Sequence, residues 1–164
     1  EVEGFIINAS QDHWFIISRR GKDVDINGGF ESYKHSRLLR AYSLDSALVK
    51  HVLPLYSRGD YDTAIFRAFK EVEVRVRKRG GYPDTLVGVP LARKAFDAQS
   101  GPLRDKSAQD EAEREARAHL FAGALGLFKN PSSHRNIDFD NPREVAEIIL
   151  FANYLLRVVD STSK

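Results

Sequence analysis

The chain has no cysteine and no methionine among its 164 residues, and only one tryptophan. Without cysteine, a disulfide scaffold and thiolate zinc sites are excluded, and we expect a reducing, cytoplasmic compartment. No apolar run is long enough to span a bilayer, so we predict no membrane partner and no signal peptide. Because the chain starts at Glu1 and lacks Met, we expect it to be a fragment or a processed product that follows an upstream domain.

A strong excess of either charge is also missing, because the chain has 25 Lys and Arg and 23 Asp and Glu, which gives a net charge of +2. Any affinity for nucleic acid must therefore come from local patches. The residues His13, His35, His51 and His119 are scattered without metal-ligand spacing, so we predict no metal site. A phosphate-cradling glycine loop and a serine-hydrolase elbow are absent, and we expect no cofactor.

The first 34 residues differ from the remainder. Two short β-prone runs, Phe5–Ile7 and Trp14–Ile17, predict a hairpin similar to the wing of a winged-helix domain. Residues 22–34 contain Gly28-Gly29 and scattered charges, which is typical of a linker. We therefore predict a β-hairpin and linker over residues 1–34, as the tail of an upstream domain, and a helical domain over residues 35–164.

Apolar residues at helical spacing dominate the second region. They predict an all-α bundle of four main helices, supplemented by a short helix within residues 83–98. The main helices are expected over about 44–57, 60–79, 107–128 and 141–159. Asp60, a capping box of Ser107 with Asp110, and Asn141-Pro142 are the predicted helix starts, and Gly80-Gly81 is a predicted stop.

The run from Gly126 to Arg135 combines a cation, an amide, a proline, two hydroxyls and an imidazole. In an unbroken helix, residues five apart point about 140° away from each other. Lys129 and His134 therefore converge only if the backbone breaks between them, and Pro131 supplies a break, with Asn130 as the N-cap of a new helix. A helix N-terminus beside Lys129 and His134 suits a phosphate. The simpler alternative is a surface turn in which Asn130 caps a helix and His134 packs locally.

Several ordered stretches carry a family resemblance. The segment from Gly59 to Asp160 resembles the HEPN superfamily, and within it the bacterial Ymh-type branch. The matching stretches are Gly59-Asp60-Tyr61, residues 66–77, Leu91–Phe96, Gly101-Pro102-Leu103, and residues 120–124 running into 129–135. The resemblance implies a helical bundle that homodimerises. It also implies a metal-independent ribonuclease of toxin, abortive-infection or antiphage defence systems, with the signature R-N-x-x-x-H. Lys129 stands where that signature has arginine.

RNA carries its own nucleophile, the 2′-hydroxyl, so such an enzyme needs proton transfer and charge stabilisation rather than a metal. The resemblance implies that His134 is the general acid and base. Lys129 and Arg135 then stabilise the phosphorane, while Asn130 and Ser133 assist. The Lys-for-Arg change keeps a second class open, which is a catalytically inactive module for RNA binding, dimerisation or partner docking.

Three further predictions concern the surroundings of the motif. Arg75, Arg77, Lys78 and Arg79 either contact an RNA backbone or complement the dipole at the end of their helix. Glu73 either orients a site cation or forms an ordinary exposed ion pair at helix spacing. The small residues 122–126 predict close backbone packing in a two-fold dimer. An upstream domain or an inhibitory protein is the remaining predicted partner.

Overall fold

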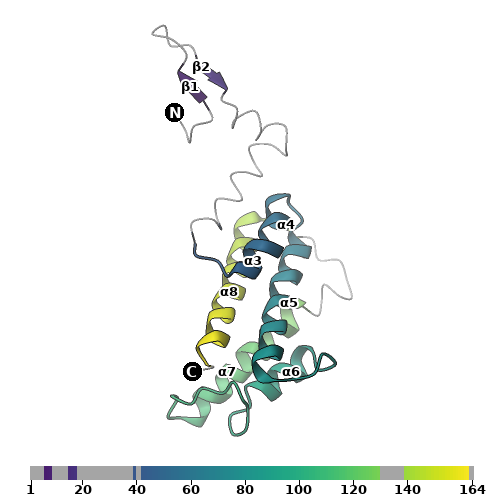
Figure 1. Ribbon diagram of the computed structural model, residues 1–164, viewed down its shortest axis with the longest axis vertical. Coiled ribbons are helices and arrows are strands. Elements are labelled where there is room, and N and C mark those ends of the chain that lie inside the picture. Colours follow the sequence, from purple (N-terminus) through teal and green to yellow (C-terminus); the bar gives the residue numbers. More distant parts are fainter. Residues whose placement is uncertain (1–5, 9–14, 18–38, 40–41, 130–138, 163–164) are drawn as a thin grey trace.

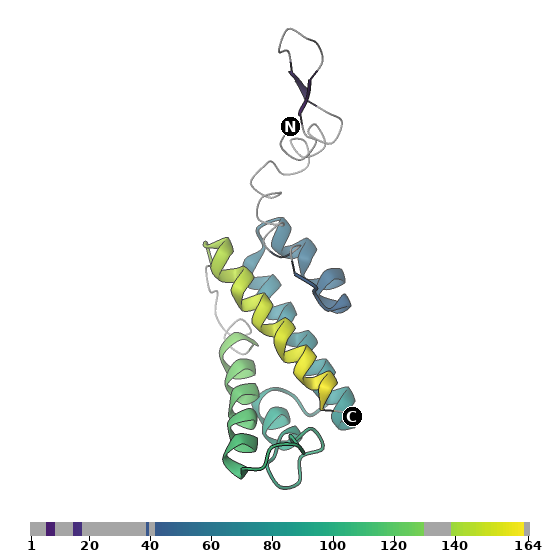
Figure 2. The same cartoon turned by 90° about the vertical axis from the view of Figure 1, so that its left-hand side faces the viewer.

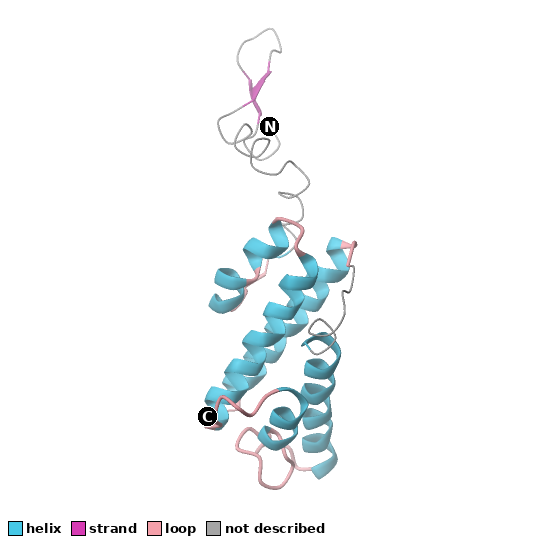
Figure 3. Cartoon of the chain, turned by 90° about the vertical axis from the view of Figure 1, so that its right-hand side faces the viewer, coloured by secondary structure: helices cyan, strands magenta, loops and turns pink. Residues whose placement is uncertain are grey.

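The computed structural model describes residues 6–8, 15–17, 39, 42–129 and 139–162 (Figure 1). Its short strands β1 (Ile6–Asn8) and β2 (Phe15–Ile17) pair antiparallel, with Ile7 opposite Ile16. The turn of the predicted hairpin and the predicted linker lie outside the described residues. The described part of the second region consists of helices and the loops between them, as Figure 3 shows. Its helices are α3 (Ser46–His51), α4 (Leu53–Ser57), α5 (Tyr61–Gly80), α6 (Gly88–Ala95), α7 (Glu111–Ala124), the π-helix η1 (Leu125–Lys129) and α8 (Pro142–Ser161).

The two longest helices, α5 and α8, lie side by side along the length of the bundle (Figures 1 and 2). The predicted apolar stripe of α5 is fully buried, and so are Val145, Ile149, Leu155 and Val159 of α8. Burial of each such side chain contributes about 1.5–3 kcal/mol, which drives the packing of the two helices. The all-α prediction for this region is confirmed.

The ends of these helices follow local chemistry. Gly81 closes α5 in the left-handed conformation at φ 69°, where a side chain would be strained. The Asn141 side chain accepts a hydrogen bond from the Arg143 amide, and Pro142 occupies the first turn of α8. Asp60 precedes α5 as predicted, but its carboxylate does not cap the helix. Instead it binds the Arg58 guanidinium at 2.6 Å.

The prediction of a single helix over residues 44–57 is wrong. The chain forms α3, capped by the Asp45 side chain on the Ala47 amide, and then restarts as α4 after Val52. Pro54 lies in the first turn of α4, where its missing N–H breaks the hydrogen-bond ladder of a continuous helix. The bundle is therefore built from α5, α7 and α8 with short helices around them, rather than from four main helices.

The capping box predicted at Ser107 is also displaced. Asp110 caps α7 by accepting from the Ala112 amide, so the helix begins at Glu111. The Ser107 hydroxyl instead donates to Asp105, 2.6 Å away. Asp105 offers Ser107 a partner within the preceding loop, and this local bond competes with helix formation.

Packing of α7 and η1 against α6 and α5 completes the core. The Phe96 and Phe121 rings stack with their centroids 3.9 Å apart, and this pair joins α7 to the end of α6. Phe128 of η1 stacks on Phe69 of α5 at 4.7 Å. A Cβ added to Gly126 would lie 3.3 Å from Cγ2 of Val89, so a small residue is needed where η1 approaches α6.

Candidate functional site

Lys129 is the last residue of a helix that changes its geometry just before it ends. Over Leu125–Lys129, α7 continues as the π-helix η1, with hydrogen bonds between residues five apart instead of four. Short π-helical turns are frequent at functional sites. Packing of Leu125 and Phe128 in the core holds this turn, and Lys129 is directed towards α5.

Glu73 of α5 meets Lys129 there. Its carboxylate oxygen Oε2 lies 3.1 Å from Lys129 Nζ and accepts a hydrogen bond of 2.6 Å from the Gly88 amide. The other oxygen, Oε1, lies 3.5 Å from a guanidinium nitrogen of Arg77. The predicted ion pair at helix spacing is present, with Arg77 four residues later, but only 3% of Glu73 is exposed, so the prediction that this pair is an exposed one is wrong. The alternative prediction, that Glu73 orients a site cation, agrees with these contacts.

The position of Glu73 explains why its charge is tolerated. A buried carboxylate is stable only when it is paired and hydrogen-bonded, and Glu73 has two cations and one amide around it. The amide belongs to Gly88, the first residue of α6, and so contributes the positive end of that helix. Glu73 therefore joins α5, α6 and η1 at one point.

Arg77 extends this cluster towards solvent. Its Nε donates to Asp84, 3.0 Å away, and the Asp84 side chain is almost fully exposed. The side chain of Lys129 is 18% exposed, so it too reaches the surface from a mostly buried position. The cluster thus pairs two cations, Arg77 and Lys129, with two carboxylates, Glu73 and Asp84, and it fixes Lys129 at the point where the chain enters the polar motif.

The other predicted residues of the motif, Asn130, Ser133, His134 and Arg135, lie outside the described residues, as does the predicted break at Pro131. Both flanks of their segment are described. Lys129 precedes it, bound to Glu73, and Phe139 follows it, packed against the core. The motif is thus tied to the bundle on either side. Of the predicted site, the structure brings together Lys129 and Glu73.

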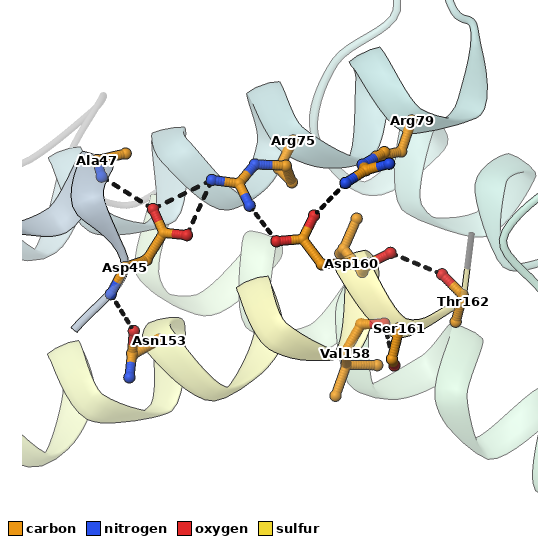
Figure 4. A network of polar contacts seen from close by, with 10 residues as sticks. Asp45, Ala47, Arg75, Arg79, Asn153, Val158, Asp160, Ser161 and Thr162 are labelled. Atoms are coloured by element: carbon orange, nitrogen blue, oxygen red, sulfur yellow. Dashed lines mark hydrogen bonds and ion pairs between the residues drawn. The ribbon is translucent and has the colours of Figure 1, made fainter. Parts of the chain in front are cut away.

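The basic cluster at the end of α5 binds carboxylates of its own chain. Arg75 pairs with Asp45 at 3.0 Å and with Asp160, and Arg79 binds Asp160 at 3.0 Å (Figure 4). Lys78 is exposed. The alternative that these cations complement the dipole of α5 is therefore incomplete. Arg75 and Arg79 also connect α5 to α8 and to Asp45, the N-cap of α3. Contact with RNA by Arg75, Arg77, Lys78 and Arg79 stays a prediction.

Asn153 belongs to the same network and was missed by the sequence reasoning. It is 4% exposed, accepts a hydrogen bond of 2.8 Å from the Asp45 amide, and donates to the Ser43 carbonyl at 3.2 Å (Figure 4 shows the first contact). A signal was present, because Asn153 is an amide within the long apolar run of α8. Such a residue in a core is normally there to satisfy another polar group.

The small residues at the end of α7 mostly pack within the chain. Ala122 and Ala124 are buried, and Gly126 approaches Val89 of α6. The face of α7 and η1 that points away from the bundle carries Leu120, Gly123 and Leu127, at spacings of three and four residues. Leu120 is 42% exposed and Leu127 is 63% exposed. The close packing predicted for this segment is thus intramolecular in part, and the two-fold dimer stays a prediction.

Within the described ranges, no three His, Asp or Glu side chains come together in a way that suits a metal ion. Among the same residues, every helix is too short or too polar to cross a membrane.

Comparison with known proteins adds the family. A family model described as a protein of unknown function, Hypoth_Ymh, matches residues 42–159. The chain belongs to the Hypoth_Ymh family. The match begins before α3, earlier than the resemblance from Gly59, and extends almost to the end of α8. It therefore contains both Glu73 and Lys129, whereas β1 and β2 lie outside it. No curated protein and no solved structure matches the chain.

Proposed function

We propose that this Hypoth_Ymh chain is a metal-independent endoribonuclease of the HEPN type. RNA is cleaved by attack of its 2′-hydroxyl on the adjacent phosphate. The observation that carries the proposal is the pair of Glu73 and Lys129, in which a buried carboxylate holds a cation immediately before the Asn130-to-His134 motif. A cation that is already fixed stabilises developing negative charge without the cost of reorganising it during the reaction.

Each residue has a role set by its chemistry. His134 removes the proton from the 2′-hydroxyl and returns one to the leaving 5′ oxygen, as imidazole does near neutral pH. Lys129 and Arg135 stabilise the charge of the phosphorane, and Asn130 and Ser133 offer further hydrogen bonds. Glu73 acts through Lys129, by positioning it. Lys78 is exposed and suits a contact with the RNA backbone.

The biological setting follows from the resemblance. We place the protein in a bacterial toxin or antiphage defence system, of the abortive-infection kind, acting in the cytoplasm. A nuclease without a cofactor requirement needs restraint, and an upstream domain or an inhibitory protein is the proposed source of it.

A homodimer is part of this proposal. The exposed face of Leu120, Gly123 and Leu127 is apolar, and the small residue between the two leucines allows close approach of a second copy. Light scattering at micromolar concentration is expected to give twice the chain mass. Leu127→Glu is expected to halve that mass, whereas Val49→Glu, which alters another exposed apolar position on α3, is not. A monomer before any substitution contradicts the dimer.

A second function has its own supporting observation. The Lys129 ammonium is engaged by Glu73, and a lysine cannot grip a phosphate in the bidentate manner of arginine. These two features favour a catalytically inactive module that binds RNA or docks a partner through the same motif.

Incubation with bulk RNA, with and without EDTA, separates the two functions. The nuclease is expected to cut in both conditions and to leave 2′,3′-cyclic phosphate ends, because the 2′-hydroxyl is the attacking group. A 2′-deoxy substitution at the cut site is expected to block the reaction. RNA that is shifted intact on a gel supports the binding module instead. Cleavage that EDTA abolishes contradicts the metal-independent mechanism.

A further inference from the structure

A cavity of about 450 Å³ lies far from Lys129, between the loop before α7, the side of α7 and the end of α8. Its volume falls within the range of small-molecule sites. From Arg117, one of its lining residues, to Lys129 the helix rises roughly 18 Å. The cavity is thus separate from the proposed nuclease site, and a ligand bound in it is independent of the proposed function.

The cavity is lined by polar side chains, and cations predominate. Arg104, Lys106 and Arg117 face a single carboxylate, Asp105. Among the residues that the structure describes, no aromatic or aliphatic side chain lines it. This lining disfavours an apolar ligand or a stacked base and favours an anion.

The single carboxylate is already occupied. Asp105 binds Arg117 through one oxygen and accepts bonds from the amide and hydroxyl of Ser107 through the other, at 2.9 and 2.6 Å. Hydrogen bonds from Ser107 keep the pKa of Asp105 below its usual value. Asp105 therefore braces Arg117 and Ser107 and does not neutralise the other two cations. Among the described residues, Arg104 and Lys106 form no ion pair. Hydrogen bonds from Ser100, and to a smaller extent the charge of Arg104, lower the pKa of Asp97, so Arg104 has one carboxylate in its neighbourhood.

Arg104 is held in place by the loop. A terminal guanidinium nitrogen donates to the Gly101 carbonyl, 3.1 Å away, which uses one of its five donors. A Cβ on Gly101 would lie 2.4 Å from the Asp97 amide nitrogen, so this tight turn admits only glycine. The guanidinium is thus preorganised, which lowers the entropy lost when it binds a ligand.

The end of α8 completes the cavity. The negative end of a helix opposes an anion, but here the last turn has its own caps. The Ser161 hydroxyl donates to the Val158 carbonyl at 2.8 Å, and the Thr162 hydroxyl donates to the Val159 carbonyl at 2.9 Å. Both hydroxyl oxygens retain acceptor capacity only, so the donors that meet a ligand come from the cations.

We propose that this cavity binds a small molecule with two adjacent phosphate groups, a pyrophosphate moiety as in nucleoside diphosphates. Three cations line one volume of about 450 Å³, which is more room than a single phosphate fills, so two linked phosphates suit it better than one. Recognition is directed at the phosphates, because none of the described lining residues has an aromatic ring on which a base could stack.

Isothermal titration calorimetry with inorganic pyrophosphate, at physiological salt, tests the proposal. One saturable site per chain is expected, with orthophosphate binding at least about tenfold more weakly. The double variant Arg104→Gln/Lys106→Gln is expected to weaken pyrophosphate binding about 10- to 100-fold, since two charge-assisted hydrogen bonds are lost. The matched control, Lys70→Gln/Arg93→Gln, removes the same charges from exposed positions elsewhere and is expected to bind as the parent does.

A second measurement does not require the variants. In the unsubstituted protein, pyrophosphate is expected to shift the backbone NMR signals of residues 104–107 and 161–162. ADP is expected to shift the same signals. Shifts confined to other surfaces, equal weakening by both double variants, or no saturation with pyrophosphate overturns the proposal. Binding of short RNA at these residues without binding of pyrophosphate also overturns it, and assigns the cavity to nucleic acid.

Discussion

The two polar faces of α5 differ in what their charges do. Glu73 and Arg77 lie on one face, where a buried carboxylate joins α6 and holds Lys129 of η1. Arg75 and Arg79 lie on the other, where partly exposed arginines bind Asp160 of α8. Residues two apart in a helix are about 200° apart, so a short alternating run in the sequence divides between two opposite neighbours.

The difference lies in the sign of the buried group. On the Glu73 face an acid is in the interior and is shared by Arg77 and Lys129, so this cluster holds one fixed cation, Lys129, at the start of the motif. On the Arg75 face the cations are paired with Asp45, the N-cap of α3, and with Asp160 of α8 (Figure 4). This network therefore connects three helices and has a structural role. We therefore expect substitutions on the first face to affect activity and stability, and those on the second to affect stability only.

The largest expected effect is on catalysis. If the chain cuts RNA, Lys129→Ala is expected to slow cleavage about 10²- to 10³-fold, because the phosphorane loses its fixed cation. His134→Ala is expected to slow it by roughly 10²- to 10⁴-fold through loss of proton transfer. Lys129→Arg is expected to retain or raise activity, since it restores a bidentate grip. Initial rates on a defined oligonucleotide measure all three.

Lys70→Ala is the control for these rates, because Lys70 is an exposed cation of α5. Full activity in both the Lys129→Ala and His134→Ala proteins contradicts the assignment of the site.

Next in size is the loss of stability on removing Glu73. Glu73→Ala leaves the Gly88 amide without its acceptor and two cations without their buried partner. The free energy of unfolding is expected to fall by about 2–3 kcal/mol, measured by urea denaturation. Glu71→Ala, two positions earlier on α5, removes the pair with Arg67 and is expected to cost less than about 1 kcal/mol. Equal losses for the two variants would show that burial of Glu73 confers no special role.

A smaller loss is expected on the opposite face. Asp160→Asn removes the carboxylate shared by Arg75 and Arg79, but Arg75 keeps Asp45 and the Asp160 side chain is 36% exposed. Solvent screening limits the expected loss to about 1 kcal/mol or less, with cleavage unchanged. If Asp160→Asn keeps its stability but loses activity, this face belongs to the site, and the difference drawn between the two faces of α5 is wrong.

The smallest expected effect is on stability at the start of α5, where the charge of Asp60 can be removed without changing the size of the side chain. The hydrogen bond from Arg58, followed by one from Thr63, keeps the pKa of Asp60 below its ordinary value of 3.8. A group whose pKa is lowered on folding stabilises the protein above the unfolded value, and this contribution is lost as the pH falls through the folded value. The difference in stability between the parent and Asp60→Asn is therefore expected to be full well above pH 3.8 and to be lost as the pH falls below that value.

At neutral pH that difference is expected to stay below about 1 kcal/mol and to shrink in about 1 M salt. A difference that persists unchanged at low pH assigns the effect to packing.

Periodicity was sufficient to predict α5 and α8. Their apolar stripes repeat at helical spacing, and strong local signals at Gly81 and at Asn141-Pro142 set an end and a start. Prediction from the sequence was wrong where a predicted capping residue has another partner nearby, or where a proline interrupts a helix. Ser107 donates a hydrogen bond to Asp105, and Asp60 binds Arg58, so neither side chain caps its helix as predicted. Pro54 interrupts the apolar stripe of residues 44–57, which the sequence alone shows as continuous. The first two errors come from a side chain with more than one available partner, and the third from a missing backbone donor.

The sequence by itself determined that helices build the described part of the chain after about Leu38, and that Lys129 precedes a polar motif. Both follow from spacing along the chain, which is a local property. Only the tertiary structure decided that Glu73 is buried and faces Lys129, more than fifty residues away, while Arg75 faces Asp160. In the sequence, Arg75 and Asp160 are ordinary charges, and no spacing along the chain pairs Glu73 with Lys129. Their partners depend on which helix lies against each face of α5, and that is a consequence of packing the apolar stripes together.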